Sequence, residues 1–182
     1  MSQTKKPLDS QATLTRSGTG WYFLNFPPEI GELFETGSPT RRVVCTLNES
    51  HTYQCALMPN KGVFSIGVSK VIREKLGLAE GDLVKVRLEQ DTSTYGAPMP
   101  EEFQEVLNQD DEGDRLFHAL TAGKQRSLIY LIGGVKNIDK RIHLALTVLE
   151  HLKKNDGNVV GDKLHEEMKR PIANPESPES YW

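Results

Sequence analysis

The stretch RRVVCTLNESHTYQCALM at residues 41–58 decides the fold. Apolar and polar side chains alternate on both sides of residues 48–50, which is typical of a β-hairpin with one buried face. A three-residue loop at 49–51 would keep both apolar sets on that face and set Cys45 opposite Cys55. We therefore predict that the two thiols are cross-strand neighbours facing a core.

The two cysteines allow three interpretations. Free cysteine is among the most often buried residue types, which favours two buried free thiols. A redox-active disulfide would need a special reason in a reducing compartment. A metal site is favoured least, because two ligands leave a tetrahedral shell incomplete and no other Cys or His has suitable spacing.

The alternation extends on both sides of this hairpin. Further strands are predicted at residues 11–16, 21–26, 64–68 and 84–88, with short helices at 28–34 and 70–76. Ser69 is suited to cap the second helix and Gly77 to end it. Together these elements predict one self-contained β-barrel domain over residues 8–95 that needs no partner strand.

The spacing of apolar residues changes behind a segment rich in Gly and Pro, Asp91–Pro100. We predict a helical segment over residues 96–154, broken near Gly133–Gly134. Its last part should pack through one apolar stripe, formed by Ile138, Ile142, Ala145, Leu149 and Leu152. Residues 155–182 are poor in apolar side chains and contain three prolines, which predicts an extended or disordered tail.

The predicted fold class is therefore α+β, mainly β: a small double-split-type β-barrel followed by a C-terminal helical segment. Charge is uneven between the two parts. Residues 1–98 carry 11 Lys and Arg against 10 Asp and Glu, and residues 99–182 carry 11 against 15. The net charge of -3 argues against a nucleic-acid binder, which usually shows a basic excess.

Location and assembly follow from features that the sequence lacks. The N-terminus has no signal-peptide pattern, and no apolar run reaches the roughly 18 residues of a membrane helix. We expect a cytoplasmic protein without a membrane partner, as a monomer or weak homodimer.

Short motifs occur in order along residues 8–91. They include GWYF at 20–23, PEI at 28–30, ALMP at 56–59, and VSK at 68–70 followed by LGL at 76–78. This pattern resembles a bacterial family known as domain of unknown function family 1905, which implies a small closed or partly closed β-barrel. Residues 68–89 are also similar to the strand–helix–turn–strand unit of double-split barrels in the AbrB and SpoVT regulators.

The predicted helical segment resembles a different family. The motifs FHAL at 117–120 and VK at 135–136, with KRI at 140–142, are similar to the YdeI/OmpD-associated helical tail often fused behind this barrel. That tail is of the bacteriocin-protection type. The resemblance implies a link to bacteriocin or stress protection and supplies no mechanism.

No catalytic constellation is apparent. No serine has glycine both two residues before and two after it, as a nucleophile elbow requires. Gly18–Thr19–Gly20 precedes a strand, whereas a dinucleotide fingerprint needs a following helix. The five histidines lack metal-binding spacing and are expected at the surface. We expect no enzyme activity, cofactor or metal.

Aromatic and basic residues of the front half form the best candidate site. Trp21 and Tyr22 must point to opposite sides of their strand, so we expect one in the core and one exposed. The predicted ligand patch consists of Trp21, Arg42, Lys70 and Arg73, where an anion could also use backbone N–H groups at the start of the second helix. The alternative is a solvated basic face beside core aromatics.

Three functions follow as hypotheses. The first is a non-enzymatic module that binds a small molecule or a protein. The second is a double-split-barrel DNA-binding regulator, which would need a dimer with a continuous basic face. The third is an unrecognised enzyme, which would need a pocket with perturbed titratable groups.

Overall fold

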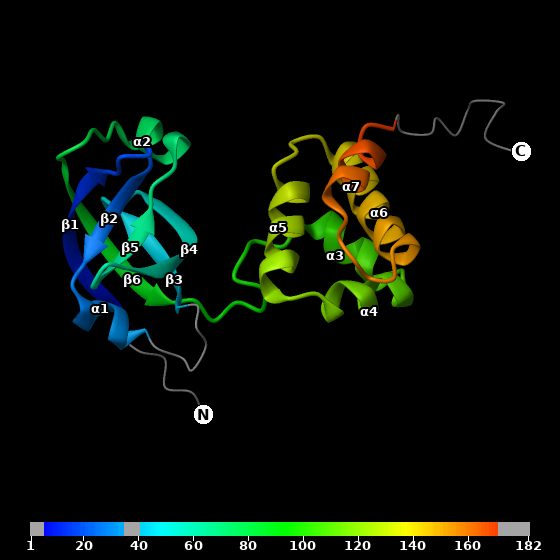
Figure 1. Ribbon diagram of the computed structural model, residues 1–182, viewed down its shortest axis with the longest axis horizontal. Helices are drawn as coiled ribbons and strands as arrows, with labels where there is room; N and C mark the ends of the chain where they lie inside the picture. Colours follow the sequence, from blue (N-terminus) through cyan, green and yellow to red (C-terminus); the bar gives the residue numbers. More distant parts are fainter. Residues whose placement is uncertain (1–5, 35–40, 171–182) are drawn as a thin grey trace, which may run out of the picture. The chain divides into compact units, whose positions relative to one another are not determined.

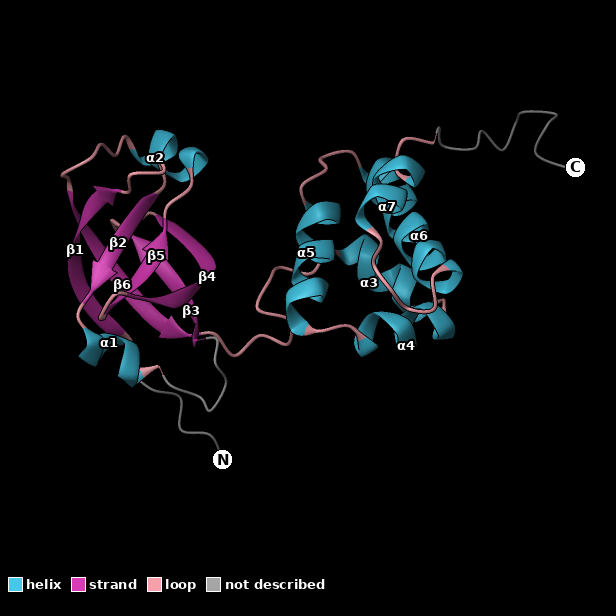
Figure 2. Ribbon diagram, in the orientation of Figure 1, coloured by secondary structure: helices cyan, strands magenta, loops and turns pink. Residues whose placement is uncertain are grey.

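The computed structural model describes residues 6–34 and 41–170. The chain forms two compact units, residues 1–96 and 97–182. Strands make up most of the first unit and helices the second (Figure 2). Within residues 6–34 and 41–170, none of the helices has the length and apolar character needed to cross a membrane.

Six antiparallel strands close a barrel in the first unit (Figure 1). They are β1 (Leu8–Arg16), β2 (Tyr22–Phe26), β3 (Arg41–Leu47), β4 (His51–Asn60), β5 (Val63–Gly67) and β6 (Leu83–Gln90). Their order around the barrel is β1-β2-β5-β4-β3-β6, and β6 pairs again with β1. The barrel therefore closes within one chain, with every strand paired on both sides.

The alternation seen in the sequence explains the barrel interior. Val84, Val86 and Leu88 of β6 are buried, whereas the intervening Lys85 and Arg87 are exposed. The same rule buries residues of β1 to β5, among them Leu14, Leu24, Val43, Leu57 and Ile66. Removing these side chains from water is the main force that closes the sheet.

Two short helices lie at opposite ends of the barrel, α1 (Pro28–Leu33) and α2 (Lys70–Leu76) (Figure 1). Ser69 caps α2 by accepting a hydrogen bond from the Ile72 N–H, and Gly77 ends it with a φ of 64°, both as predicted. In α1, a methyl group on Gly31 would lie 2.0 Å from the Phe64 ring, so only glycine allows this close packing.

The register of the β3–β4 hairpin differs from the prediction by two residues. Cys45 pairs with Tyr53, and Cys55 pairs with Val43. The turn begins one residue earlier than expected, because Asn48 adopts a φ of 46° and exchanges hydrogen bonds with the Lys85 backbone. A two-residue slip leaves the same side chains on the inner face, so alternation predicts the face and the turn sets the register.

Five helices form the second unit: α3 (Glu101–Asn108), α4 (Asp111–Ala119), α5 (Ala122–Gly133), α6 (Ile138–Lys154) and α7 (Gly161–Glu167). Phe103 and Phe117 meet edge-on in its core, with ring centroids 5.1 Å apart. The chain breaks between α5 and α6, as predicted, and Asn137 caps α6. The predicted class, an α+β protein with a barrel followed by helices, is confirmed.

Helix α7 forms in the segment for which the sequence predicts an extended or disordered tail. Leu164 of α7 is buried, and Glu167 at its end accepts a hydrogen bond from His151 of α6. The hydrogen bond between His151 and Glu167 joins residues 16 positions apart, so local composition does not indicate it. The part of the tail prediction that concerns residues 171–182 lies outside the described residues.

The expectation that all five histidines lie at the surface is wrong for His151, whose side chain is fully buried. The Val160 N–H donates to its Nε2 atom at 3.0 Å. The neutral ring therefore carries its proton on Nδ1, which donates to a Glu167 oxygen at 2.7 Å. Hydrogen bonds at both ring nitrogens thus link the segment around α7 to α6.

Candidate functional site

Cationic side chains and aromatic rings meet at the end of the barrel that α2 covers. The guanidinium carbon of Arg73, in the last turn of α2, lies 3.7 Å from the centre of the Tyr22 ring. Arg16, the cross-strand partner of Tyr22, has its guanidinium carbon 5.9 Å from the same ring. A cation over an aromatic face is attracted by the ring quadrupole, so Tyr22 helps to position both arginines.

Trp21 precedes Tyr22 in the turn between β1 and β2. Its side chain is 69% exposed, whereas Tyr22 packs against the barrel core. The Trp21 backbone is fixed, because its N–H donates to the Ser17 hydroxyl and its carbonyl accepts from the Ser17 N–H. The expected division into one exposed and one core-facing ring is therefore observed, and the exposed indole is held on an ordered turn.

A second ring pair lies on β4 at the same end. His51 stacks on Tyr53 with ring centroids 5.8 Å apart, and Lys75 of α2 lies 3.3 Å from the His51 ring. The Tyr53 hydroxyl donates to the Gly67 carbonyl, and burial raises the pKa of this phenol far above its ordinary value. Neither ring is among the residues predicted to bind a ligand, although His51 and Tyr53 share the inward alternation of Cys55.

Three of the four residues predicted to bind a ligand lie at the α2 end of the barrel. Lys70 begins α2 and is highly exposed, with its ammonium 3.6 Å from Glu74. Trp21 and Arg73 lie at the same end, because the Val68 N–H, just before α2, donates to the Tyr22 carbonyl. The predicted use of backbone N–H groups is weakened, since Ser69 already accepts from the Ile72 N–H.

Arg42 lies apart from the other three. It stands at the start of β3, opposite Ala56 and beside the end of β6, which strand direction places at the α1 end of the barrel. Its guanidinium donates to the Gly96 carbonyl. Arg42 therefore holds the segment that follows β6, and it does not join a patch at the α2 end.

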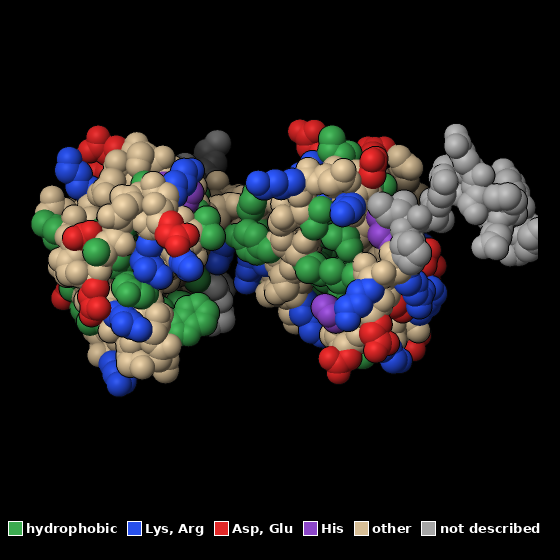
Figure 3. Space-filling model, turned by 90° about the horizontal axis from the view of Figure 1, so that it is seen from above, with side chains coloured by type: hydrophobic (Ala, Val, Ile, Leu, Met, Phe, Trp, Pro, Cys, Tyr) green, Lys and Arg blue, Asp and Glu red, His purple; other side chains and the backbone are tan. Residues whose placement is uncertain are grey.

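The α2 end is mixed in charge. Arg16, Lys70, Arg73 and Lys75 occur there together with Glu74 and with Glu80 and Asp82 of the following turn. A view onto this end shows Lys and Arg side chains interspersed with Asp and Glu (Figure 3). The α2 end therefore suits a small ligand with a local negative charge better than a long polyanion.

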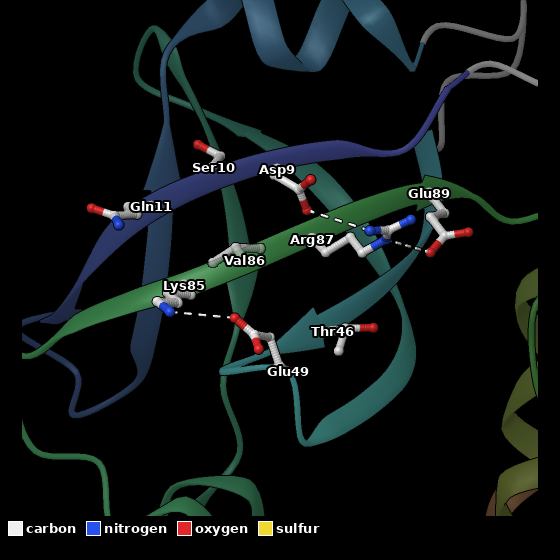
Figure 4. Close-up of a pocket in the computed structure, with 9 residues that line it drawn as sticks. All are labelled: Asp9, Ser10, Gln11, Thr46, Glu49, Lys85, Val86, Arg87 and Glu89. Carbon is white, nitrogen blue, oxygen red and sulfur yellow. Dashed lines mark hydrogen bonds and ion pairs between the residues drawn. The ribbon is translucent and has the colours of Figure 1, made fainter.

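The outer surface of β1, β6 and β3 carries a groove of about 910 Å³. Lys85 points to Glu49, and Arg87 lies between Asp9 and Glu89 (Figure 4). The nitrogen–oxygen distances are 3.3, 3.8 and 3.1 Å, respectively. These exposed ion pairs satisfy one another, so a ligand would have to displace them, and the groove is the weaker candidate.

Residues 11–88 match a protein family described as Domain of unknown function (DUF1905). The match confirms the resemblance inferred from the motifs of residues 8–91. It runs from within β1 to within β6, so the matched region contains α2 and the cation–aromatic cluster. No curated protein matches the chain.

The barrel also contains both thiols, which are free. Cys45 is buried in the core of the barrel, and Cys55 is partly buried and packs against that core. Interaction with the neighbouring Cys45 thiol, together with burial, raises the pKa of the Cys55 thiol well above its ordinary value. A thiol that stays protonated is a poor nucleophile, which favours a packing role.

Catalytic or metal chemistry has few candidates in residues 6–34 and 41–170. Over these ranges, no three His, Cys, Asp or Glu side chains gather as metal ligands would. In the helical unit, the buried His151 uses both ring nitrogens in structural hydrogen bonds. The cation–aromatic end of the barrel is therefore the arrangement with the clearest capacity to bind a ligand.

Proposed function

We propose that the DUF1905 barrel is a non-enzymatic binding module whose α2 end binds a small anion with an aromatic ring. The observation that carries this proposal is the exposed Trp21 on an ordered turn, next to Tyr22 with Arg73 on its ring. An indole offers a stacking surface, and a guanidinium offers charged donors to a carboxylate, sulfonate or phosphate.

The state of Arg73 supports this assignment. Its Nε atom is buried and has no hydrogen-bond partner among the described residues. The Tyr22 ring holds the guanidinium in place without occupying its donors, so Arg73 is positioned before any ligand arrives. A group held in its bound position loses little conformational entropy on binding.

A DNA-binding regulator is favoured less. The barrel closes within one chain, so its sheet does not require the second subunit that a swapped double-split barrel uses. Acidic side chains interrupt the cations at the α2 end (Figure 3). Duplex DNA binding relies on several cations that contact successive phosphates.

The wider role in this proposal is that of a cytoplasmic protein, monomeric or weakly dimeric, that is linked to bacteriocin or stress protection. Its support is the similarity of residues 99–153 to the YdeI/OmpD-associated tail. The binding assay below does not depend on this role.

A binding assay on paired arginine variants tests the proposal. Adenosine monophosphate, benzoate and naphthalene sulfonate, as probes, should shift backbone amide signals of Trp21, Tyr22 and Arg73 in NMR spectra. Arg73→Gln should weaken binding about tenfold or more, equivalent to about 1.4 kcal/mol. The control is Arg87→Gln, which removes a similarly charged group from the groove on β6 and should leave the affinity unchanged.

Two results would contradict the proposal. Signals that shift along β1, β6 and β3 would place binding in the groove of Figure 4. Equal effects of the two substitutions would show that overall charge, and not the position of Arg73, governs binding.

A further inference from the structure

The helical unit has a groove between α3 and α6, which pack side by side. Its volume is about 430 Å³. Val106, Ile142 and Leu146 provide apolar surface in it, and three glutamates of α3 also line it. Ile142 is 37% and Leu146 48% exposed, so large aliphatic side chains face water here.

This apolar surface belongs to side chains of α6 that do not pack into the core of the helical unit. The sequence predicts a single inward stripe that starts at Ile138 and Ile142, but the structure buries only its later members, Ala145, Leu149 and Leu152. Ile138, Ile142 and Leu146 follow one another at intervals of four residues, so they form an exposed row along one face of α6. Contiguous exposed apolar surface marks sites of association.

The rim of the groove is acidic. Glu101, Glu102 and Glu105 line it, and Arg141 is the cation that pairs with one of them, 2.6 Å from Glu102. Three carboxylates line the groove and Arg141 pairs with only one of these three, which gives the lining an acidic character. Glu101 and Glu105 are exposed, so their charges are available to a partner at modest desolvation cost.

We propose that this groove binds an amphipathic helix of a partner protein whose apolar stripe is flanked by Lys and Arg. Insertion of such a helix covers the apolar row and pairs its cations with the glutamates, which is a recurrent mode of peptide recognition. Residues 171–182 do not have this chemistry, since they contain two Glu and no Lys or Arg. The proposal concerns the helical unit and is independent of ligand binding at the α2 end.

The test uses synthetic peptides about 18 residues long, in which Leu recurs at helical spacing and the other positions are Lys. A second peptide has Glu in place of Lys, and a third has the Leu/Lys composition in scrambled order. Titration of the full-length protein, followed by fluorescence anisotropy, should show the Leu/Lys helix binding at least tenfold more tightly than either control peptide. Equal binding of the ordered and scrambled peptides would overturn the proposal.

Three variants test whether the peptide binds in this groove. Leu146→Ser should weaken binding of the Leu/Lys peptide about tenfold, whereas Leu131→Ser, which removes a similarly exposed leucine from α5, should have no effect. Glu105→Lys should weaken the Leu/Lys peptide and strengthen the Leu/Glu peptide. Equal losses in the two serine variants would contradict the proposal, as would an unchanged peptide preference in Glu105→Lys, given unchanged circular dichroism.

Sedimentation of the protein without peptide completes the test. We expect a monomer at the concentrations used for titration. A dimer that Leu146→Ser dissociates would show that a second copy of this chain fills the groove, and the partner-helix proposal would then be wrong.

Discussion

The barrel and the helical unit are stabilised in different ways. In the barrel, each strand pairs with two neighbours and the inward side chains are mostly apolar. In the helical unit, an apolar core is supplemented by polar contacts between distant residues: His151 with Val160 and Glu167, Asp110 with Lys153, and Glu102 with Arg141. The barrel thus depends mainly on a repeated pattern of strand pairing, to which specific contacts such as that between Ser65 and Asn25 are added. The described residues of the helical unit form no sheet, so its stability depends more on a few specific pairs.

Substitution of the buried His151 should give the largest change in stability that tests this difference. His151→Ala leaves the Val160 N–H without its acceptor and the Glu167 carboxylate without its donor. Unpaired buried polar groups of this kind destabilise by about 1–3 kcal/mol. We expect urea denaturation, followed by the NMR signals of α6 and α7, to show a loss in this range while the barrel signals keep their midpoint.

His165→Ala is the matched control. His165 lies on α7 itself but is exposed, so its removal should change the free energy of unfolding little. If both substitutions cost the same, or if His151→Ala lowers the midpoint of the barrel signals equally, the contrast between the two units fails.

Loss of the Asp110–Lys153 ion pair should lower the free energy of unfolding by a smaller amount, and this amount should depend on pH. The hydrogen bond from Lys153, assisted by the Gly113 N–H, lowers the pKa of Asp110 below its ordinary value. Because the folded pKa is below the unfolded one, the stabilisation is complete above about pH 5 and is lost as pH falls below the unfolded pKa of about 4. Asp110→Asn should therefore cost about 1 kcal/mol or less at neutral pH, since the pair is partly exposed.

Denaturation at about pH 7 and about pH 3 measures this dependence, with Asp111→Asn as the control. The asparagine at 110 can still accept from the Gly113 N–H, so the helix cap is retained. The loss of unfolding free energy caused by Asp110→Asn should be smaller at the lower pH. An equal loss at both pH values would mean that the ion pair contributes nothing to stability.

Features that depend on local sequence were predictable. Strand β3 and helix α2 occupy the residues that alternation and capping indicated, and Ser69 and Gly77 act as the cap and the stop. The β3–β4 register was not predictable, because a slip of two residues preserves every inward side chain. His151 was missed because its partners belong to a segment whose own composition gives little sign of a helix.

The candidate site was predictable only where local sequence indicates the position of its residues. Trp21, Lys70 and Arg73 could be grouped, since each lies near a turn at one end of the barrel. Arg42 was misplaced, because the end of a barrel at which a residue lies depends on the direction of its strand and on closure of the sheet. The stacking of Arg73 on Tyr22 joins α2 to β2, about 50 residues apart in the chain, and no local pattern indicates it.

Because its sheet closes within one chain, the barrel should fold as a self-contained unit. The most direct measurement is the amide NMR spectrum of a fragment that contains only residues 1–96, compared with that of the full chain. We predict a dispersed spectrum of a monomer in which the signals of β1 to β6 superimpose on those of the intact protein. A collapsed spectrum, or a fragment that folds only as a dimer, would contradict the claim.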